Sequence, residues 1–99
     1  MLSNCDSAMI FKAMSDETRL KIISLVSGTE LCACDILEEF EISQPTLSYH
    51  MKILTDSGLI HARKDGAWMR YTLNTGLVDS LQDYLHLVTS EKENTKSNC

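Results

Sequence analysis

The sequence lacks the segments that would place it in or across a membrane. No apolar run approaches the roughly 20 residues that a membrane-spanning helix needs. The N-terminal stretch has neither a basic start nor a long apolar core, so we expect no signal peptide and a cytoplasmic protein. Aromatic residues make up only 6% and hydrophobic residues 43%, which is typical of a globular, Leu-, Ile- and Met-rich helical domain.

Motifs of catalysis are also missing. The sequence has no Cys-X-X-Cys motif, no glycine-rich phosphate loop and no paired acid and base, so we expect no enzyme. Four cysteines are present: Cys5, Cys32, Cys34 and Cys99. In a reducing cytoplasm such thiols stay free, which favours metal or redox roles over structural disulfides.

Positive charge is scarce, and the net charge of −5 argues against a general nucleic-acid binder. The charge is nevertheless uneven. Residues 43–70 hold four basic and two acidic residues, a balance of +2, whereas the rest of the chain holds five basic and twelve acidic residues, a balance of −7. An acidic body with one basic stretch indicates local contact with phosphates.

Hydrophobic periodicity predicts one domain over residues 1–90, followed by a polar, disordered tail over 91–99. In the second of the expected helices, Leu20, Ile23 and Leu25 or Val26 form the predicted buried stripe. A domain this short buries a modest core, so a partner subunit would add apolar burial. The helices are expected within residues 4–16, 15–28, 34–41, 43–58 and 75–90.

The helix over 43–58 has the clearest pattern. Ser43 is a good N-cap, and Pro45 fits in the first turn, where its missing N–H is not needed. Leu47, Met51 and Leu54 lie at i, i+4 and i+7 and therefore form one apolar face. The opposite face is unusually polar, which distinguishes this helix from its neighbours.

A hairpin with a basic tip follows that helix. Residues 59–62 and 68–73 favour strands, and the Asp-Gly pair between them is a strong hairpin signal. Trp68 is expected to anchor the hairpin in the core. A short helix, a tight turn, an amphipathic helix and a basic-tipped hairpin make a winged helix-turn-helix, so the predicted fold is mainly α with one β-hairpin.

Cys32 and Cys34 lie one residue apart. In a regular helix such residues point about 200° apart around the axis and could not hold one ion. At the frayed start of a helix the backbone can adjust, and the positive helix end would lower the thiol pKa. Two soft sulfurs suit arsenite, antimonite, cadmium or lead, while burial of both as small hydrophobic side chains is the alternative.

The segments ELCACDI, SQPTLSYHMKIL, SGLI and RKDGAWMRYTLN together resemble the ArsR/SmtB family of bacterial metal-responsive repressors, above all its arsenic-responsive members. The resemblance runs from about Asp16 to Asn74. It implies a winged-helix homodimer that represses resistance genes on inverted-repeat operator DNA and is released when a toxic ion binds. The first and last helices are the implied dimer interface, with Leu77, Leu81, Leu85 and Val88 on the apolar face of the last one.

The resemblance implies that Cys32 and Cys34 bind the inducer, arsenite or antimonite, and that DNA binding requires no cofactor. Leu37 stands where many arsenic-responsive members carry a third cysteine, so a third ligand must be a water, a small thiol or Cys5. An N-terminal cysteine completes the site in the cadmium- and lead-sensing relatives, which makes those ions the alternative inducers. Cys99 is expected to be an incidental terminal thiol.

The resemblance also implies the DNA contacts and the switch. We expect the ion to deform the start of the third helix and thereby the recognition helix packed directly against it. Helix side chains would reach base edges or phosphates in the major groove, and hairpin side chains would reach phosphates or the minor groove. The helix residues are Ser43, Gln44, Thr46, Ser48, Tyr49, His50 and Lys52, and the hairpin residues are Arg63, Lys64 and Arg70.

A dithiol redox regulator is the other hypothesis. It would use Cys32 and Cys34, or Cys5, and would release DNA under oxidative stress without any metal.

Overall fold

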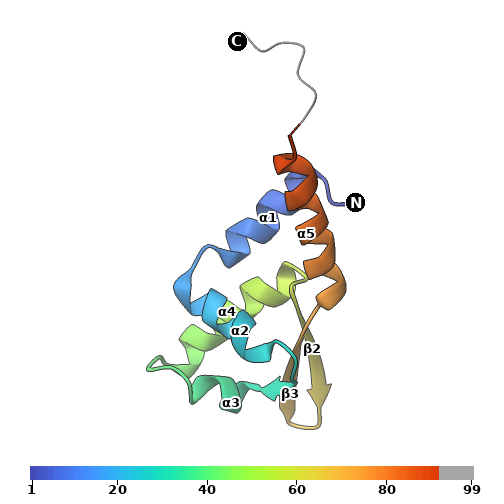
Figure 1. Ribbon diagram of the computed structural model, residues 1–99. Coiled ribbons are helices and arrows are strands. Elements are labelled where there is room, and N and C mark those ends of the chain that lie inside the picture. Colours follow the sequence, from blue (N-terminus) through green and yellow to red (C-terminus); the bar gives the residue numbers. More distant parts are fainter. Residues whose placement is uncertain (92–99) are drawn as a thin grey trace.

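The computed structural model describes residues 1–91, which form five helices and three short strands (Figure 1). The predicted order of helices and hairpin is confirmed, and the fold is a winged helix-turn-helix. Part of the expected tail, residues 92–99, lies outside the described residues. The elements are α1 (Asn4–Met14), α2 (Glu17–Val26), β1 (Leu31–Cys32), α3 (Ala33–Leu37), α4 (Gln44–Asp56), β2 (Ile60–Asp65), β3 (Trp68–Leu73) and α5 (Thr75–Thr89).

Polar caps set the starts of the helices. The Ser3 hydroxyl accepts the Asp6 N–H at α1, and the Asp16 carboxylate accepts the Arg19 N–H at α2. Ser43 caps α4 as predicted, with Pro45 in its first turn, and Gly58 follows that helix with a φ of +84°. These side chains satisfy N–H groups that have no partner within the helix, so the helix boundaries follow from local chemistry.

The sheet contains one strand that the sequence analysis did not predict. β2 and β3 form the expected hairpin, in which Ala62 pairs with Tyr71. β1 adds to the other side of β3, with Leu31 opposite Tyr71 and Cys32 opposite Arg70. A two-residue strand has no periodicity of its own, so only its pairing with β3 defines it.

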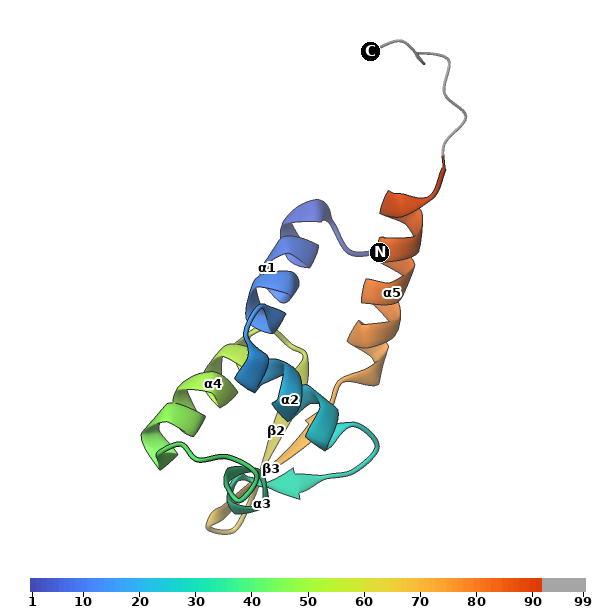
Figure 2. The ribbon, with the colours of Figure 1, turned by 60° about the vertical axis from the view of Figure 1, so that its left-hand side comes forward.

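The core lies where α2, α4 and the sheet meet, and α1 and α5 extend from it at the end opposite the hairpin (Figures 1 and 2). Leu47, Met51 and Leu54 are buried as predicted. Ile22 and Val26 form the buried face of α2, while Leu20 is 48% exposed, so its assignment to the stripe is wrong. None of the helices in the described part of the chain is long and apolar enough to cross a membrane.

One further core expectation needs correction. Trp68 is 55% exposed and does not anchor the hairpin in the core, because it lies at the start of β3 next to the turn. On α5, Leu81 is buried, but Leu85 and Val88 are exposed, because they lie beyond the reach of the core. The α5 stripe is therefore only partly used within the chain.

One buried polar group on α1 lacks a partner. The Ser7 side chain is fully buried, and its hydroxyl makes no hydrogen bond among the described residues. A buried, unpaired hydroxyl costs free energy because it has lost its hydrogen bonds to water.

We expect Ser7→Ala to raise the free energy of unfolding by about 1 kcal/mol. Ser3→Ala on the same helix should lower it by about 1 kcal/mol, since it removes the N-cap. Urea unfolding at one fixed protein concentration measures both changes. Equal destabilisation by the two substitutions would contradict the assignment of Ser7 as an unpaired group.

Candidate thiol site and nucleic-acid surface

Cys32 and Cys34 meet at the junction between β1 and α3. Cys32 ends the strand with extended backbone angles (φ −83°, ψ 164°) and is the N-cap of α3, while Cys34 is the second residue of that helix. Their Sγ atoms lie 2.8 Å apart. The expectation that the pair escapes regular helix geometry is confirmed, because the chain turns from strand to helix between the two residues.

Asp35 is a further member of this cluster. One ligand atom from each of Cys32, Cys34 and Asp35 lies within 4.8 Å of the others. The Asp35 carboxylate also accepts the Cys32 N–H at 3.2 Å, which is the capping-box arrangement. The position of an acid three residues after the cap is the signal by which the sequence could have identified this residue.

The expected lowering of the thiol pKa is wrong for Cys32. Its hydrogen bond with the Cys34 thiol, and next the carboxylate of Asp35, raise the pKa of the Cys32 thiol above its usual value. The same contact lowers the pKa of the Asp35 carboxyl, because the Cys32 side chain and N–H stabilise the carboxylate. A short helix adjacent to a carboxylate therefore favours the protonated thiol.

The donor set suits a soft ion but supplies only two sulfurs. Leu37 occupies the next turn of α3, where a third sulfur was sought, and the third nearby donor is the hard carboxylate oxygen of Asp35. Cys5 lies in the first turn of α1, at the other end of the molecule from α3 (Figure 1). Cys99 lies outside the described residues.

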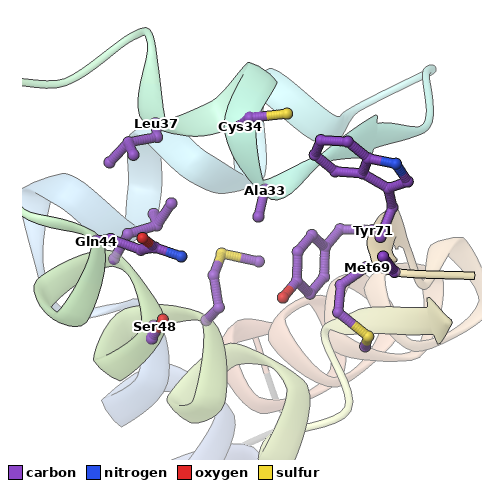
Figure 3. A pocket seen from close by; sticks show the side chains of 11 residues that line it. Ala33, Cys34, Leu37, Gln44, Ser48, Met69 and Tyr71 are labelled. Atoms are coloured by element: carbon purple, nitrogen blue, oxygen red, sulfur yellow. The ribbon is translucent and has the colours of Figure 1, made fainter.

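A cavity of about 360 Å³ lies between α3, α4 and the hairpin (Figure 3). Ala33, Cys34 and Leu37 line it from α3, and residues of α4 and the hairpin close the other sides. α3 also contacts β1 and β3 of the sheet. Ile36 of α3 is fully buried in the same core cluster as Leu47 and Met51 of α4, so both helices contribute to one core and the cavity lies beside it.

The outer face of α4 is exposed as a groove-reading helix requires. Ser43, Gln44, Thr46, Ser48, Tyr49 and Lys52 are all exposed. The Ser43 hydroxyl is already engaged with Thr46, whose N–H it accepts and whose side chain it contacts at 3.0 Å. Of this set, Gln44 and Ser48 also border the cavity.

His50 lies differently from the other α4 residues of the predicted set. Its side chain is only 12% exposed, and its Nδ1 lies 3.1 Å from an Arg19 guanidinium nitrogen and 3.9 Å from the Asp16 carboxylate. Arg19 in turn donates to the Ala13 carbonyl oxygen at 2.6 Å. The sequence analysis did not identify Arg19, which joins α1, α2 and α4 through contacts far apart in the sequence.

Two basic residues of the hairpin, Arg63 and Arg70, form ion pairs. Arg63 contacts Glu30 at 2.7 Å, which raises the pKa of its guanidinium, and Arg70 contacts Asp65 at 3.0 Å. On α4, Lys52 contacts Asp56 at 3.0 Å. Such exposed pairs are worth about 0–1 kcal/mol, so phosphates could replace the carboxylates at little cost.

Comparisons with known proteins agree with this architecture. The model of the arsR family of bacterial regulatory proteins matches residues 16–62. The arsenical resistance operon repressor of Staphylococcus aureus is 44% identical over 92 residues, which cover 93% of this chain and 88% of that protein. A homologue of the cadmium resistance regulatory protein CadC, also from Staphylococcus aureus, is 39% identical over 84 residues, covering 82% and 69% of the two chains.

Solved structures show the same fold. Reduced HlyU from Vibrio cholerae N16961 superposes with a TM-score of 0.71 at 30% sequence identity, covering 88% of this chain and 92% of that chain.

The cap of α2 generates a pH prediction. The Arg19 N–H, more than any other group, lowers the pKa of the Asp16 carboxyl below its usual value of 3.8. The carboxylate therefore stabilises the folded state at pH values above 3.8, and this contribution disappears as the pH falls through the lower, folded-state pKa.

We expect Asp16→Asn to be less stable than the parent at neutral pH and to approach it in stability in acid, because the asparagine keeps a capping oxygen without the charge. Urea unfolding of both proteins at pH values on either side of 3.8 measures the difference. A difference that does not change with pH would show that the charge contributes nothing.

Proposed function

The chain belongs to the arsR family of bacterial regulatory proteins, and from this premise we propose that it is a homodimeric operator repressor that arsenite or antimonite releases from DNA. The family and the winged helix-turn-helix predicted from the motifs are thereby confirmed. The inducer, the dimer and the residue roles that follow are our proposal.

One observation supports the sensing role most directly. Two thiols, one at the end of β1 and one in the first turn of α3, lie with their sulfur atoms 2.8 Å apart, close to the proposed recognition helix α4. Burial as ordinary hydrophobic side chains explains Cys32, which is buried, but not Cys34, which is exposed. An exposed thiol next to a second thiol is accessible to a soft ion from solution.

The proposed switch acts through the elements that Cys32 and Cys34 join. An ion held by both sulfurs restrains the turn between β1 and α3. β1 pairs with β3 of the hairpin, and residues 38–43 connect α3 to the recognition helix α4. The ion releases DNA only to the extent that it binds more tightly to the conformation in which these elements fit the operator poorly.

For DNA binding we propose that α4 enters the major groove and the hairpin follows the adjacent backbone. Gln44, Thr46, Ser48 and Tyr49 face outward from α4 and are the proposed base-reading residues. The basic side chains and the Ser43 hydroxyl would contact phosphates. His50 would position α4 through Arg19 rather than reach the DNA.

The dimer would form through α1 and α5. Met9 on α1 and Leu85, Leu87 and Val88 on α5 are exposed apolar side chains. The two helices lie together, with the Tyr84 hydroxyl donating to the Asn4 side chain at 2.8 Å. A two-fold dimer through this face predicts an inverted-repeat operator with half-sites about 10 bp apart.

Two alternatives keep the same site. A cadmium or lead sensor would add Cys5 of the partner subunit, which the position of Cys5 on the proposed dimer helix α1 favours. A redox regulator would join Cys32 and Cys34 in a disulfide, which the short distance between their sulfurs favours. In either case the thiol site would control the same DNA-binding elements, α4 and the hairpin.

We expect the double variant Cys32→Ser/Cys34→Ser to bind an operator, selected by the protein from random DNA, as the parent does. It should need at least about 100-fold more arsenite for release, because both soft ligands are lost. Fluorescence anisotropy of the labelled operator, with arsenite, antimonite, cadmium and lead as titrants, measures release.

Cys5→Ser is the matched control and should leave arsenite release unchanged, whereas a loss of cadmium or lead release in this variant alone would assign Cys5 to the site. Release of the parent by peroxide without any ion would favour the redox alternative. Unchanged arsenite release of the double variant would refute the sensing role.

We expect Gln44→Ala to reduce discrimination between operator variants by about 1–3 kcal/mol at one base position. Lys64→Ala should instead weaken binding to all sequences alike. It should also reduce the slope of log affinity against log salt concentration by about one, because about one counterion fewer is released. Binding isotherms on operator and unrelated DNA at several salt concentrations separate the two effects. The assignment of roles fails if both substitutions change sequence discrimination equally.

A further inference from the structure

The cavity between α3 and α4 has the character of a ligand site. Its volume of about 360 Å³ lies in the range of small-molecule pockets, which are mostly apolar with a few polar groups. Leu37, Met51, Trp68 and Tyr71 contribute apolar and aromatic surface, and Cys34 lies on its wall (Figure 3). A cavity bordered by one of the sensing thiols offers space for more than a bare ion.

The number of sulfurs in the adjacent thiol site matches one type of arsenic compound. Trivalent arsenic forms three bonds, so inorganic arsenite can use three thiols. An arsenic atom that already carries one carbon substituent uses two. Among residues 1–91, Cys32 and Cys34 are the two cysteines at this site, and Leu37 lines the cavity on the next turn of α3.

We propose that the thiol site binds a trivalent arsenical with one organic, preferably aromatic, substituent more tightly than arsenite, because the substituent occupies the cavity while arsenic binds both thiols. This inference rests on the proposed sensing role of Cys32 and Cys34. In the binding step two S–H and two As–O bonds break and two As–S bonds form. Each hydroxyl of the R–As(OH)2 group leaves as water with one thiol proton, and arsenic stays trivalent.

The cavity fits an aromatic ring by size and by chemistry. An apolar protein cavity of about 150 Å³ holds benzene, so 360 Å³ admits a phenyl ring together with its link to arsenic. The Met51 and Met69 thioethers and the Trp68 ring line the cavity, and thioethers and aromatic rings both make favourable contacts with a ring. A ring there would also cover part of Trp68, which is now 55% exposed.

The position of the cavity connects such a substituent to DNA binding. Gln44 and Ser48, two of the proposed base-reading residues, form its border on α4. A ring seated between the helices therefore contacts both the sensor helix and the recognition helix. An arsenical without a substituent would touch only the thiols.

Trp68 is the single tryptophan of the chain, so intrinsic fluorescence reports on the cavity. The full chain is titrated with phenylarsenous acid, methylarsenous acid and arsenite, and tryptophan emission and operator release are followed in parallel. We expect the phenyl compound to bind and release DNA at concentrations at least about tenfold lower than arsenite. It should also change tryptophan emission more than the methyl compound does.

Two variants test the cavity with both thiols intact. The Ala33 methyl group points into the cavity (Figure 3), so Ala33→Leu should abolish the preference for phenyl over methyl while the methyl compound still binds. Leu37→Cys should raise the affinity for arsenite by about tenfold or more, because a third thiolate becomes available. Cys5→Ser, which is remote from the cavity, should change none of these preferences.

The outcomes separate this inference from the proposed function. Equal affinities for the three compounds, or a phenyl preference that survives Ala33→Leu, would overturn the role of the cavity while arsenite sensing stands. Failure of all three arsenicals to bind the thiols or to release DNA would overturn the proposed function as well.

Discussion

The change from strand to helix between Cys32 and Ala33 is the constraint on which the geometry of the thiol pair depends. Cys32 is held on the sheet by its pairing with Arg70, and its N–H is satisfied by the Asp35 carboxylate that opens the helix. In an uninterrupted helix the two thiols would point about 200° apart. Because the backbone turns between them, the two sulfurs face each other.

This junction has two kinds of neighbour, the sheet and the cavity. On the sheet side, backbone pairing links Cys32 to β3, and the ion pair between Glu30 and Arg63 adds a contact with the hairpin. On the helix side, Cys34 and Leu37 of α3 border the cavity, while Ile36 is buried in the core that α3 shares with α4. A tightly packed core transmits or resists strain, whereas a space can be filled by a ligand. The junction is therefore paired with a strand on one side and borders a cavity on the other.

The helix α4 is held in place by side-chain packing and by a polar contact with α2. Leu47, Met51 and Leu54 fix α4 in the core, and Arg19 and His50 hold its side against α2. Lys52, Arg63 and Arg70 are paired with carboxylates at the surface, in contacts worth about 0–1 kcal/mol. The helix is thus held by packing where it meets the core, and the charged side chains of α4 and the hairpin can exchange partners where they meet solvent.

Local patterns were sufficient for most of the fold and for the choice of the thiol pair. Ser43, Pro45 and Gly58 mark the limits of α4, and the Asp-Gly turn marks the hairpin, because caps and tight turns depend on a few neighbouring residues. The Cys-X-Cys spacing and its distance from the Ser-Gln-Pro segment indicated the family. These features do not require knowledge of distant contacts.

Contacts between distant segments decided the rest. β1 exists only because β3 pairs with it, Trp68 is exposed because the hairpin carries it past the core, and His50 turns inward because Arg19 is there to meet it. The Cys32 thiol has a raised pKa because folding places a thiol and a carboxylate beside it. The cavity beside Cys34 is likewise formed by side chains from three elements. Burial, pKa and empty space depend on which segments meet, and that is settled only when the chain packs as a whole.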